Sequence, residues 1–330
     1  MIFLLALPLA FIAFLFEAYP RFLNREYGVD IWTHLLYLKE FHKQKGIPKK
    51  IENGFLVPGH YDYPPAFIWI MSLFPFRTVE RFEFLFSPFF DSLHVILIFV
   101  ISFLLTGNVL ISLLAQTLYI LTPIIVLENS SATPRSLGYT LFTILMMSFI
   151  FFTQTQNATW LIPAVVSGSL IFLSHRFTTQ GFLLFAIIFS IVERNPVFVA
   201  VFIVCFLIAV VTSKGFYLKV LVGHMGNLKF WKDNIKYRFA HQVKGNLTPA
   251  ATRDFIFRTY TQFLKFPPFV LEITNPWIIV SLYIFLFEPS DNFILQRLVI
   301  WVVISYVLAI LTMWVPKLRF LGEGQRYLEL

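Results

Sequence analysis

Residues 196–213 read PVFVAVFIVCFLIAVVTS, without one charged side chain. A helix of roughly 20 mostly apolar residues crosses the hydrocarbon core of a bilayer, so this stretch predicts a membrane span. The whole chain has the same character: of its 330 residues, 58% are hydrophobic and only 13% are charged. Soluble domains carry about 25% charged residues. The composition therefore predicts a membrane protein and excludes a soluble fold. The single cysteine, Cys205, also excludes a disulfide scaffold.

Working outward from this stretch, further apolar runs predict a polytopic all-α protein with eight or nine transmembrane helices. The predicted spans are 2–18, 89–106, 109–127, 136–153, 160–174, 180–192, 196–213, 269–287 and 294–315. The run 180–192 is short enough to be a half-span. Gly and Pro occur in the short connections, as at Gly107-Asn108 and Asn195-Pro196. We expect one integral membrane domain over residues 1–330.

Two long polar segments, 19–88 and 214–268, interrupt the apolar pattern. Six predicted spans separate them, so they are expected on the same side of the membrane. Ten basic residues against Asp233 and Asp254 give the second segment a net charge of +8, equal to that of the whole chain. By the positive-inside rule this face would be cytoplasmic. The same charge would also suit anionic lipid head groups or phosphate.

The first polar segment contains a predicted amphipathic helix that would lie in the membrane interface. Ile31, Leu35, Leu38 and Phe41 recur at helical spacing, and Lys side chains take the opposite face. Asp30 stands at the start of this helix, where a carboxylate either caps the backbone N–H groups or is free for chemistry. His34 follows one turn later, and a lone histidine there is more often a surface residue than a ligand.

The stretch Gly59-His60-Tyr61-Asp62-Tyr63-Pro64-Pro65 leads into a second predicted interfacial helix. Two consecutive prolines end any preceding helix and can begin the next one. Asp62, Tyr61 and Tyr63 therefore either only shape a rigid turn or line a polar pocket beside Asp30 and His34.

An acidic residue at the head of an interfacial helix, followed about 30 residues later by Tyr-Pro-Pro, resembles the GT-C superfamily of membrane glycosyltransferases, with a mannosyltransferase or aminoarabinose-transferase-like layout. The resemblance implies an inverting transferase that takes a sugar from a polyprenyl-phosphate donor to a lipid, glycan or protein acceptor. It implies Asp30 as the catalytic base. It also implies an extracytoplasmic active face, in the plasma membrane or the endoplasmic reticulum, with segments 19–88 and 214–268 as extracytoplasmic loops.

Further elements on the same predicted face fit this resemblance. They are Arg135 after Thr133-Pro134, the turn His175-Arg176, and Glu323 with Arg326-Tyr327 near the end of the chain. The Arg and His side chains, with Tyr327, would hold the donor phosphate, since a guanidinium pairs bidentately with phosphate. An Arg at the end of a span can equally reach toward lipid head groups. The chain stops at Leu330, where family members continue with another helix, which predicts a compact member or a piece of a longer chain.

The predicted chemistry requires no cofactor. If a divalent metal is bound, Asp30, His34 and Asp62 are the expected ligands, because the first two are one helical turn apart. The expected partners are the lipid-linked sugar, membrane lipids and, in one alternative, another subunit of a membrane complex. Nucleic acid is not expected, since the basic residues flank membrane spans and form no recognisable module.

Two other functions remain open at this stage. The first is a transporter or flippase for an anionic lipid or solute, and the second is a non-catalytic subunit of a membrane complex. A transporter usually carries ionisable residues within its spans, and often an internal repeat. We find no repeat among the predicted spans and expect them to be almost free of ionisable groups, which favours the enzyme.

Overall fold

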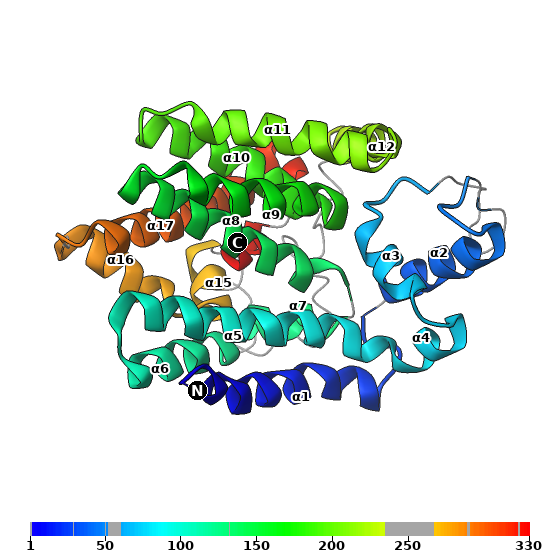
Figure 1. Ribbon diagram of the computed structural model, residues 1–330, viewed down its shortest axis with the longest axis horizontal. Coiled ribbons are helices and arrows are strands. Elements are labelled where there is room, and N and C mark those ends of the chain that lie inside the picture. The colour runs from blue at the N-terminus through cyan, green and yellow to red at the C-terminus, as the bar shows by residue number, and fades with distance from the viewer. Residues whose placement is uncertain are drawn as a thin grey trace, which may run out of the picture. The chain divides into compact units, whose positions relative to one another are not determined.

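The computed structural model describes residues 2–28, 30–49, 51, 61–131, 133–234, 267–288, 291–322 and 324–330. The chain divides into two compact units, Met1–Gly223 and His224–Leu330. Within the described ranges every regular element is a helix and none is a strand (Figure 1). The expected all-α class is therefore confirmed, whereas the single domain over residues 1–330 stays a prediction.

The first unit is a bundle of helices with a small helical group at one end (Figure 1). Its elements are η1 (Ile2–Ala6), α1 (Leu7–Leu23), α2 (Asp30–Gln44), α3 (Ala66–Ser72), α4 (Phe76–Phe82), η2 (Glu83–Leu85), α5 (Phe86–Thr106), α6 (Val109–Ile120), α7 (Pro123–Asn129), α8 (Arg135–Thr155), η3 (Ala158–Trp160), α9 (Leu161–Ser174), α10 (Arg176–Val192), α11 (Val197–Thr212) and the start of α12 (Phe216–Asp233). Helix α5 packs against α1, α6 and α8, and α9 packs between α8 and α11. Helices α2, α3 and α4 form the small group.

Four helical stretches are long and apolar enough to cross a membrane: Ile2–Leu23, Phe76–Thr106, Arg135–Thr155 and Phe293–Trp314. Helices α11 and α12 together would make a fifth, but they meet at a bend of 119°. These helices indicate a multi-pass membrane protein. The number of full-length spans in the described ranges is thus four or five, fewer than the predicted eight or nine.

Two prolines explain part of this difference. The predicted span 109–127 is interrupted before Pro123, which begins α7, and the predicted span 269–287 is interrupted at Asn275-Pro276. Proline lacks an N–H and its ring clashes with the preceding turn, so a helix breaks there. The 12 residues of α6 then extend about 18 Å, which is short of the roughly 30 Å hydrocarbon core.

The short connection at Gly107-Asn108 forms as predicted. Gly107 ends α5 with a positive φ of 63°, a conformation that is free of strain only for glycine. The Asn108 side chain then accepts hydrogen bonds from the backbone N–H groups of Leu110 and Ile111, at 2.9 and 3.2 Å. This N-cap fixes the start of α6, so α5 and α6 run as neighbouring antiparallel helices.

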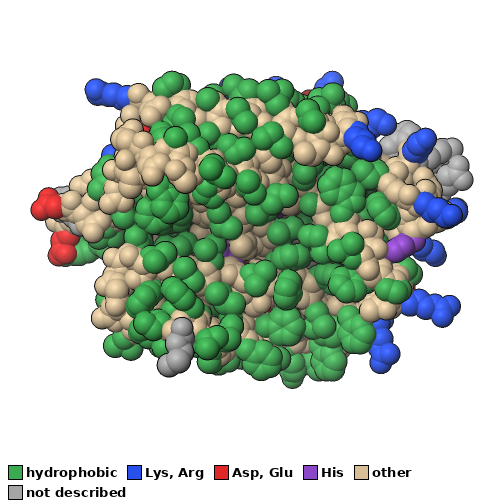
Figure 2. Space-filling model, viewed as in Figure 1, with side chains coloured by type: hydrophobic (Ala, Val, Ile, Leu, Met, Phe, Trp, Pro, Cys, Tyr) green, Lys and Arg blue, Asp and Glu red, His purple; other side chains and the backbone are tan. Residues whose placement is uncertain are grey.

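The outer surface of the first unit is apolar. Phe11 on α1 and Leu110 on α6 are 61% and 75% exposed. Figure 2 shows hydrophobic side chains covering most of this face over α1, α5, α6 and α11, while Lys and Arg side chains gather near α2, α3 and α4. An exposed apolar face of this extent is typical of helices that contact lipid.

A buried ion pair joins the two ends of the first polar segment. Arg21 near the end of α1 donates from Nε to both carboxylate oxygens of Glu83 in η2, at 3.0 and 3.1 Å. Arg21 Nη1 also donates to the carbonyl oxygens of Tyr27 and Gly28. Both charged side chains are completely buried, with exposures of 0% and 1%. The two ends of the segment between α1 and α5 are therefore fastened to each other.

The second unit is built on α17 (Phe293–Trp314), which packs against α15 (Pro267–Thr274), α16 (Ile278–Phe287), η4 (Pro316–Leu321) and η5 (Gly324–Glu329). Asn292 caps α17 by accepting from the N–H of Leu295 at 3.1 Å. Most of the predicted basic segment 214–268 lies outside the described residues.

Candidate functional site

The small helical group and the bundle meet at a polar cluster that we call the loop-end cluster: His34, Tyr61, Asp62, Tyr63 and Arg176. Arg176, the first residue of α10, forms an ion pair with Asp62, with 3.1 Å between Nη2 and Oδ1. The same nitrogen donates to the backbone oxygen of Asp62. The two charged side chains stay partly exposed, 18% for Arg176 and 42% for Asp62. Exposed ion pairs contribute only about 0–1 kcal/mol, so a ligand can displace this one at little cost.

Tyr63 joins Arg176 to His34. The Arg176 guanidinium lies 5.1 Å from the centroid of the Tyr63 ring, a cation–π contact. The His34 ring meets Tyr63 edge-to-face at 5.2 Å and Phe67 of α3 at 5.4 Å. His34 is therefore buried, with an exposure of 5%, and not the surface residue that its isolated position suggested. Its Nδ1 has no hydrogen-bond partner within the described part of the chain.

Burial controls the charge of His34. Loss of solvent lowers the pKa of this imidazole to about 4, and the nearby Asp30 carboxylate opposes that shift only in part. The ring is thus neutral at physiological pH. Burial also raises the pKa of the Tyr37 hydroxyl, with Asp62 adding to the shift and Arg176 opposing it.

Tyr61 serves as an anchor of the turn. Its hydroxyl donates to the backbone oxygen of Pro64 at 3.1 Å, and its ring stacks on Phe216 at the start of α12, with centroids 5.6 Å apart. The side chain is 2% exposed. Gly223 of α12 leaves room for the turn, since a Cβ atom there would lie 2.2 Å from Asp62 Oδ2. Of the three predicted pocket residues in this turn, Asp62 and Tyr63 are accessible and Tyr61 is not.

Asp30 lies in the first turn of α2 and is exposed. The turn before it packs closely on the connection between α7 and α8, because a Cβ on Gly28 would lie 2.9 Å from Ser131 Cα. Arg135 begins α8 in the same region but is buried and forms an ion pair with Glu128 of α7. Asp30 and His34 are one turn apart on α2, and His34 contacts Tyr63, on which Arg176 lies.

His175 lies between α9 and α10 and is 6% exposed. Its Nδ1 is 2.9 Å from Thr178 Oγ1, and its ring meets Tyr139 edge-to-face at 6.0 Å. These contacts hold the junction from which Arg176 projects. His175 is therefore placed to position Arg176, and the predicted direct contact with phosphate stays untested.

The remaining predicted residues belong to the second unit. Arg326 and Tyr327 lie in η5, where Tyr327 is completely buried. Glu323 lies outside the described residues. Gly324 packs against α17, where a Cβ would lie 2.2 Å from Met313 Cγ. The predicted role of this segment in holding the donor phosphate stays a prediction.

The expected metal ligands do not assemble. In the described parts of the chain, no three His, Cys, Asp or Glu side chains lie close enough to hold a metal ion. His34 is turned into the aromatic cluster with Tyr63 and Phe67, and Asp62 is committed to Arg176. The predicted set of Asp30, His34 and Asp62 is thus not found as a ligand triad.

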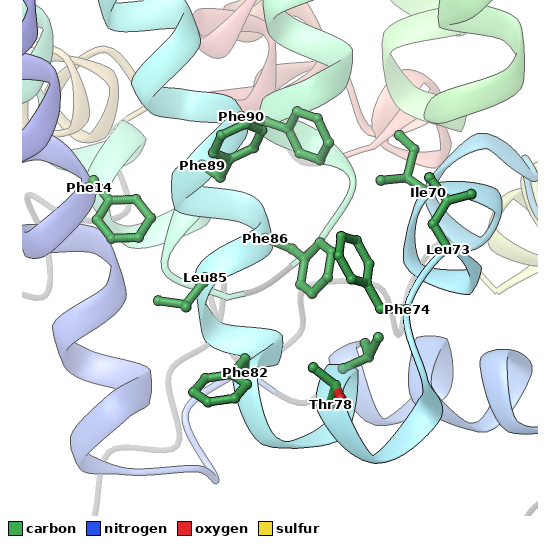
Figure 3. Close-up of a pocket in the computed structure, with 11 residues that line it drawn as sticks. Phe14, Ile70, Leu73, Phe74, Thr78, Phe82, Leu85, Phe86, Phe89 and Phe90 are labelled. Atoms are coloured by element: carbon green, nitrogen blue, oxygen red, sulfur yellow. The ribbon is translucent and has the colours of Figure 1, made fainter.

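An apolar pocket of about 470 Å³ lies between α1, α3, α4 and α5 (Figure 3). Phenylalanines dominate its wall, and Thr78 is the one polar side chain among them. The lining residues are Phe14, Ile70, Leu73, Phe74, Thr78, Val79, Phe82, Leu85, Phe86, Phe89 and Phe90. Leu73 and Phe89 are 78% and 51% exposed, so the pocket opens to the surface. Its size and composition suit a hydrocarbon chain.

Sequence reasoning missed a buried polar network inside the bundle. Glu17 of α1 and Asp91 of α5 lie within hydrogen-bonding distance of each other. Tyr119 donates to Asp91 at 2.6 Å, Asn129 donates to it at 2.7 Å, and His94 lies 2.9 Å from the Tyr119 hydroxyl. The signal was present, because Glu17 and Asp91 fall inside predicted spans 2–18 and 89–106. The expectation that the spans are almost free of ionisable groups is therefore wrong.

No protein-family model matches the sequence, and neither a curated protein nor a solved structure matches it.

Proposed function

We propose that this chain is an integral membrane glycosyltransferase that takes a sugar from a polyprenyl-phosphate donor. The observation that carries the proposal is the partly exposed Arg176, which contacts Tyr63 and Asp62, together with an open apolar pocket in the same unit. One short helix connects the two features. Phe67 of α3 contacts His34 of the loop-end cluster, whereas Ile70 of α3 lines the pocket. The seven residues of α3 span about 10 Å, so one amphipathic molecule can reach both places.

The proposed donor would place its phosphate at Arg176 and the first part of its hydrocarbon chain in the pocket. In the structure Arg176 reaches only one carboxylate oxygen of Asp62, whereas a phosphate could accept two parallel hydrogen bonds from the guanidinium. Binding would then release Asp62 from its ion pair. The freed carboxylate could then accept hydrogen bonds from sugar hydroxyl groups.

In the proposed reaction the acceptor hydroxyl gives its proton to the Asp30 carboxylate as its oxygen attacks the anomeric carbon. A bond forms between that oxygen and the anomeric carbon, and the bond from this carbon to the phosphate oxygen breaks. The electron pair leaves with the phosphate, whose negative charge Arg176 stabilises. A single in-line displacement inverts the anomeric configuration. Asp30 suits the role of base because it is an exposed carboxylate one helical turn from His34 of the loop-end cluster.

The proposal is tested with the purified full-length chain in lipid vesicles. A panel of polyprenyl-phosphate sugars is added with an acceptor mixture of lipid, glycan and peptide, and released polyprenyl phosphate is measured by mass spectrometry. We expect release from at least one donor, and its loss in Asp30→Asn. Glu26→Gln changes a nearby exposed carboxylate and serves as the control. Release that is unchanged in Asp30→Asn would remove Asp30 as the base.

One observation favours a second candidate, a transporter or flippase for an anionic lipid or solute. The buried carboxyl groups of Glu17 and Asp91 lie within candidate spans, where ionisable residues often mark transport pathways. The same vesicles separate the two functions. Movement of a labelled polyprenyl phosphate between leaflets, without any sugar release, would support transport over transfer.

A further inference from the structure

The pair formed by Glu17 and Asp91 lies outside the proposed glycosyltransferase site. The two side chains are 2% and 1% exposed, and they come from α1 and α5, which both belong to candidate membrane spans. Their carboxyl groups are within hydrogen-bonding distance. Two negative charges at this separation, out of contact with water, would repel each other strongly.

The surrounding donors identify which carboxyl group is the anion. Asp91 Oδ1 accepts from the Tyr119 hydroxyl at 2.6 Å and from Asn129 Nδ2 at 2.7 Å. An O–H···O distance near 2.6 Å is typical of a hydrogen bond to a charged oxygen. Asp91 therefore has two donors, Tyr119 and Asn129, which stabilise it as a carboxylate, whereas among the described residues Glu17 has only the Asn129 side chain as a donor.

The remaining protons of the network can be assigned. Tyr119 has one hydroxyl proton, which it donates to Asp91. His94 Nδ1, at 2.9 Å from the same oxygen, then carries the ring proton and donates to Tyr119. His94 Nε2 lies 2.8 Å from Thr143 Oγ1 and accepts from that hydroxyl in the neutral tautomer. The histidine is neutral in this arrangement and supplies no positive charge to the carboxyl pair.

The nearest charged side chains are also committed elsewhere. Arg21, one turn beyond Glu17 on α1, is held by Glu83 through Nε and by backbone carbonyls through Nη1, while its Nη2 has no hydrogen-bond partner among the described residues. Glu128, beside Asn129 on α7, is paired with Arg135. Three oxygens of the network, Glu17 Oε2, Asp91 Oδ2 and Asn129 Oδ1, have no donor among the described residues. Among the described residues no cation forms an ion pair with Glu17 or Asp91, so a proton is the simplest way to satisfy these oxygens.

We propose that Glu17 and Asp91 bind one proton between them, as a carboxylic acid–carboxylate pair with Glu17 as the acid. The shared proton removes the repulsion and gives Glu17 a hydrogen bond to donate to Asp91. The cluster then carries a single negative charge, which the Tyr119 hydroxyl and the Asn129 amide stabilise. The site is an intramembrane proton-binding site that is independent of the proposed glycosyl transfer.

Infrared difference spectroscopy of the full-length protein in vesicles tests this site directly. At neutral pH we expect a band from the C=O stretch of a protonated carboxyl group. Exposed carboxylates are ionised at this pH and do not contribute to that band. The band should disappear in Glu17→Gln and persist in Glu26→Gln, which changes an exposed carboxylate after α1. Absence of the band from the unmodified protein at neutral pH would overturn the proposal, as would its persistence in Glu17→Gln.

A thermal melting series provides a second test that does not depend on band assignment. Gln at position 17 can donate from its amide to Asp91 as the protonated Glu17 does, so Glu17→Gln should melt at an unchanged temperature. Asp91→Asn should melt at a lower temperature, because Tyr119 and Asn129 lose a charged acceptor. A sodium ion between the carboxylates is the competing occupant. Stabilisation by sodium chloride but not by choline chloride, at constant pH, would overturn the proton site in favour of that ion.

Discussion

At the residue scale, Arg176 is the side chain on which the proposed donor site depends. Its ion pair with Asp62 is partly exposed, and its guanidinium lies on Tyr63. We expect Arg176→Ala to raise the apparent KM for the lipid donor at least about tenfold, since a charge-assisted hydrogen bond contributes about 1.5–3 kcal/mol. Steady-state kinetics in vesicles measure this effect.

Arg194 provides the matched control for Arg176, because it follows the other end of the same helix and is exposed. Arg194→Ala should leave the donor KM unchanged. An equal effect of the two substitutions would mean that Arg176 acts through general charge and not through a specific phosphate contact.

The lowered pKa of the buried His34 predicts that the stability of the folded protein depends on pH. Its pKa in the folded protein is about 4, against an ordinary value near 6.5, so the unfolded chain takes up the proton first as the pH falls. The folded state should therefore lose stability between pH 6.5 and pH 4, by roughly 3 kcal/mol in total. Melting in detergent across this range should show the loss, and His34→Phe should reduce it. A pH profile that is identical in His34→Phe would assign the loss to other groups.

Some contacts of the candidate site could be predicted from the sequence and others could not. Asp62, Tyr63 and Arg176 were expected to share a face, and they do contact one another. The burial of His34 was not foreseeable, because it depends on α3 folding back onto α2 to bring Tyr63 and Phe67 against the ring. The pairing of Glu17 with Asp91 depends on contacts between α1 and α5, which periodicity along one helix does not reveal.

At the element scale, the packing of α9 against α11 depends on a glycine. A Cβ on Gly168 would lie 2.6 Å from Cys205 Sγ and 3.0 Å from Phe182 Cε1. We expect Gly168→Ala to lower the melting temperature, and Cys205→Ala in the same chain to restore part of the loss by removing the sulfur. The coupling between the two substitutions should lie in the range of about 0.5–3 kcal/mol found for contacting residues.

Gly226 of α12 is the control for this experiment, because a Cβ there would meet nothing within 4 Å. Gly226→Ala should be neutral or stabilising, by up to about 1 kcal/mol from helix propensity. Strict additivity of Gly168→Ala and Cys205→Ala would contradict the close approach of α9 and α11.

Some helix ends could be predicted from the sequence, because turn-forming and capping residues determine them locally. Glycine and asparagine marked the turn between α5 and α6, whereas the break before α7 at Pro123 was not predicted. Helix length was less predictable, since an apolar run has the same composition whether it crosses the bilayer once or folds into two shorter helices. The bend of 119° between α11 and α12 occurs where Gly215 adopts a positive φ of 79°, and a lone glycine does not specify such an angle.

At the scale of the whole first unit, the loop-end cluster defines one end of the bundle. Lys49 follows α2 at that end and is exposed, whereas Arg194, between α10 and α11, lies at the other. In a Cys205→Ser background, we expect Lys49→Cys to react with a membrane-impermeant maleimide in intact cells. Arg194→Cys should react only after permeabilisation.

Either orientation would be informative. Labelling of Lys49→Cys alone agrees with an extracytoplasmic active face, where lipid-linked sugars would be consumed. The reverse pattern would follow the positive-inside rule and would contradict the proposed glycosyltransferase. Labelling of both positions from outside would show that the helices between them do not cross the membrane an odd number of times.

The ion pair between Arg21 and Glu83 has a consequence for how such a chain can diversify. Because it fastens the two ends of the intervening segment, the bundle does not depend on how long that segment is. The entropy cost of closing a loop rises by only about 0.6 kcal/mol for each doubling of its length. Insertions in the connections between these two residues could therefore be tolerated while the helices of the bundle stay intact, whereas the residues of the proposed site within the segment must keep their places.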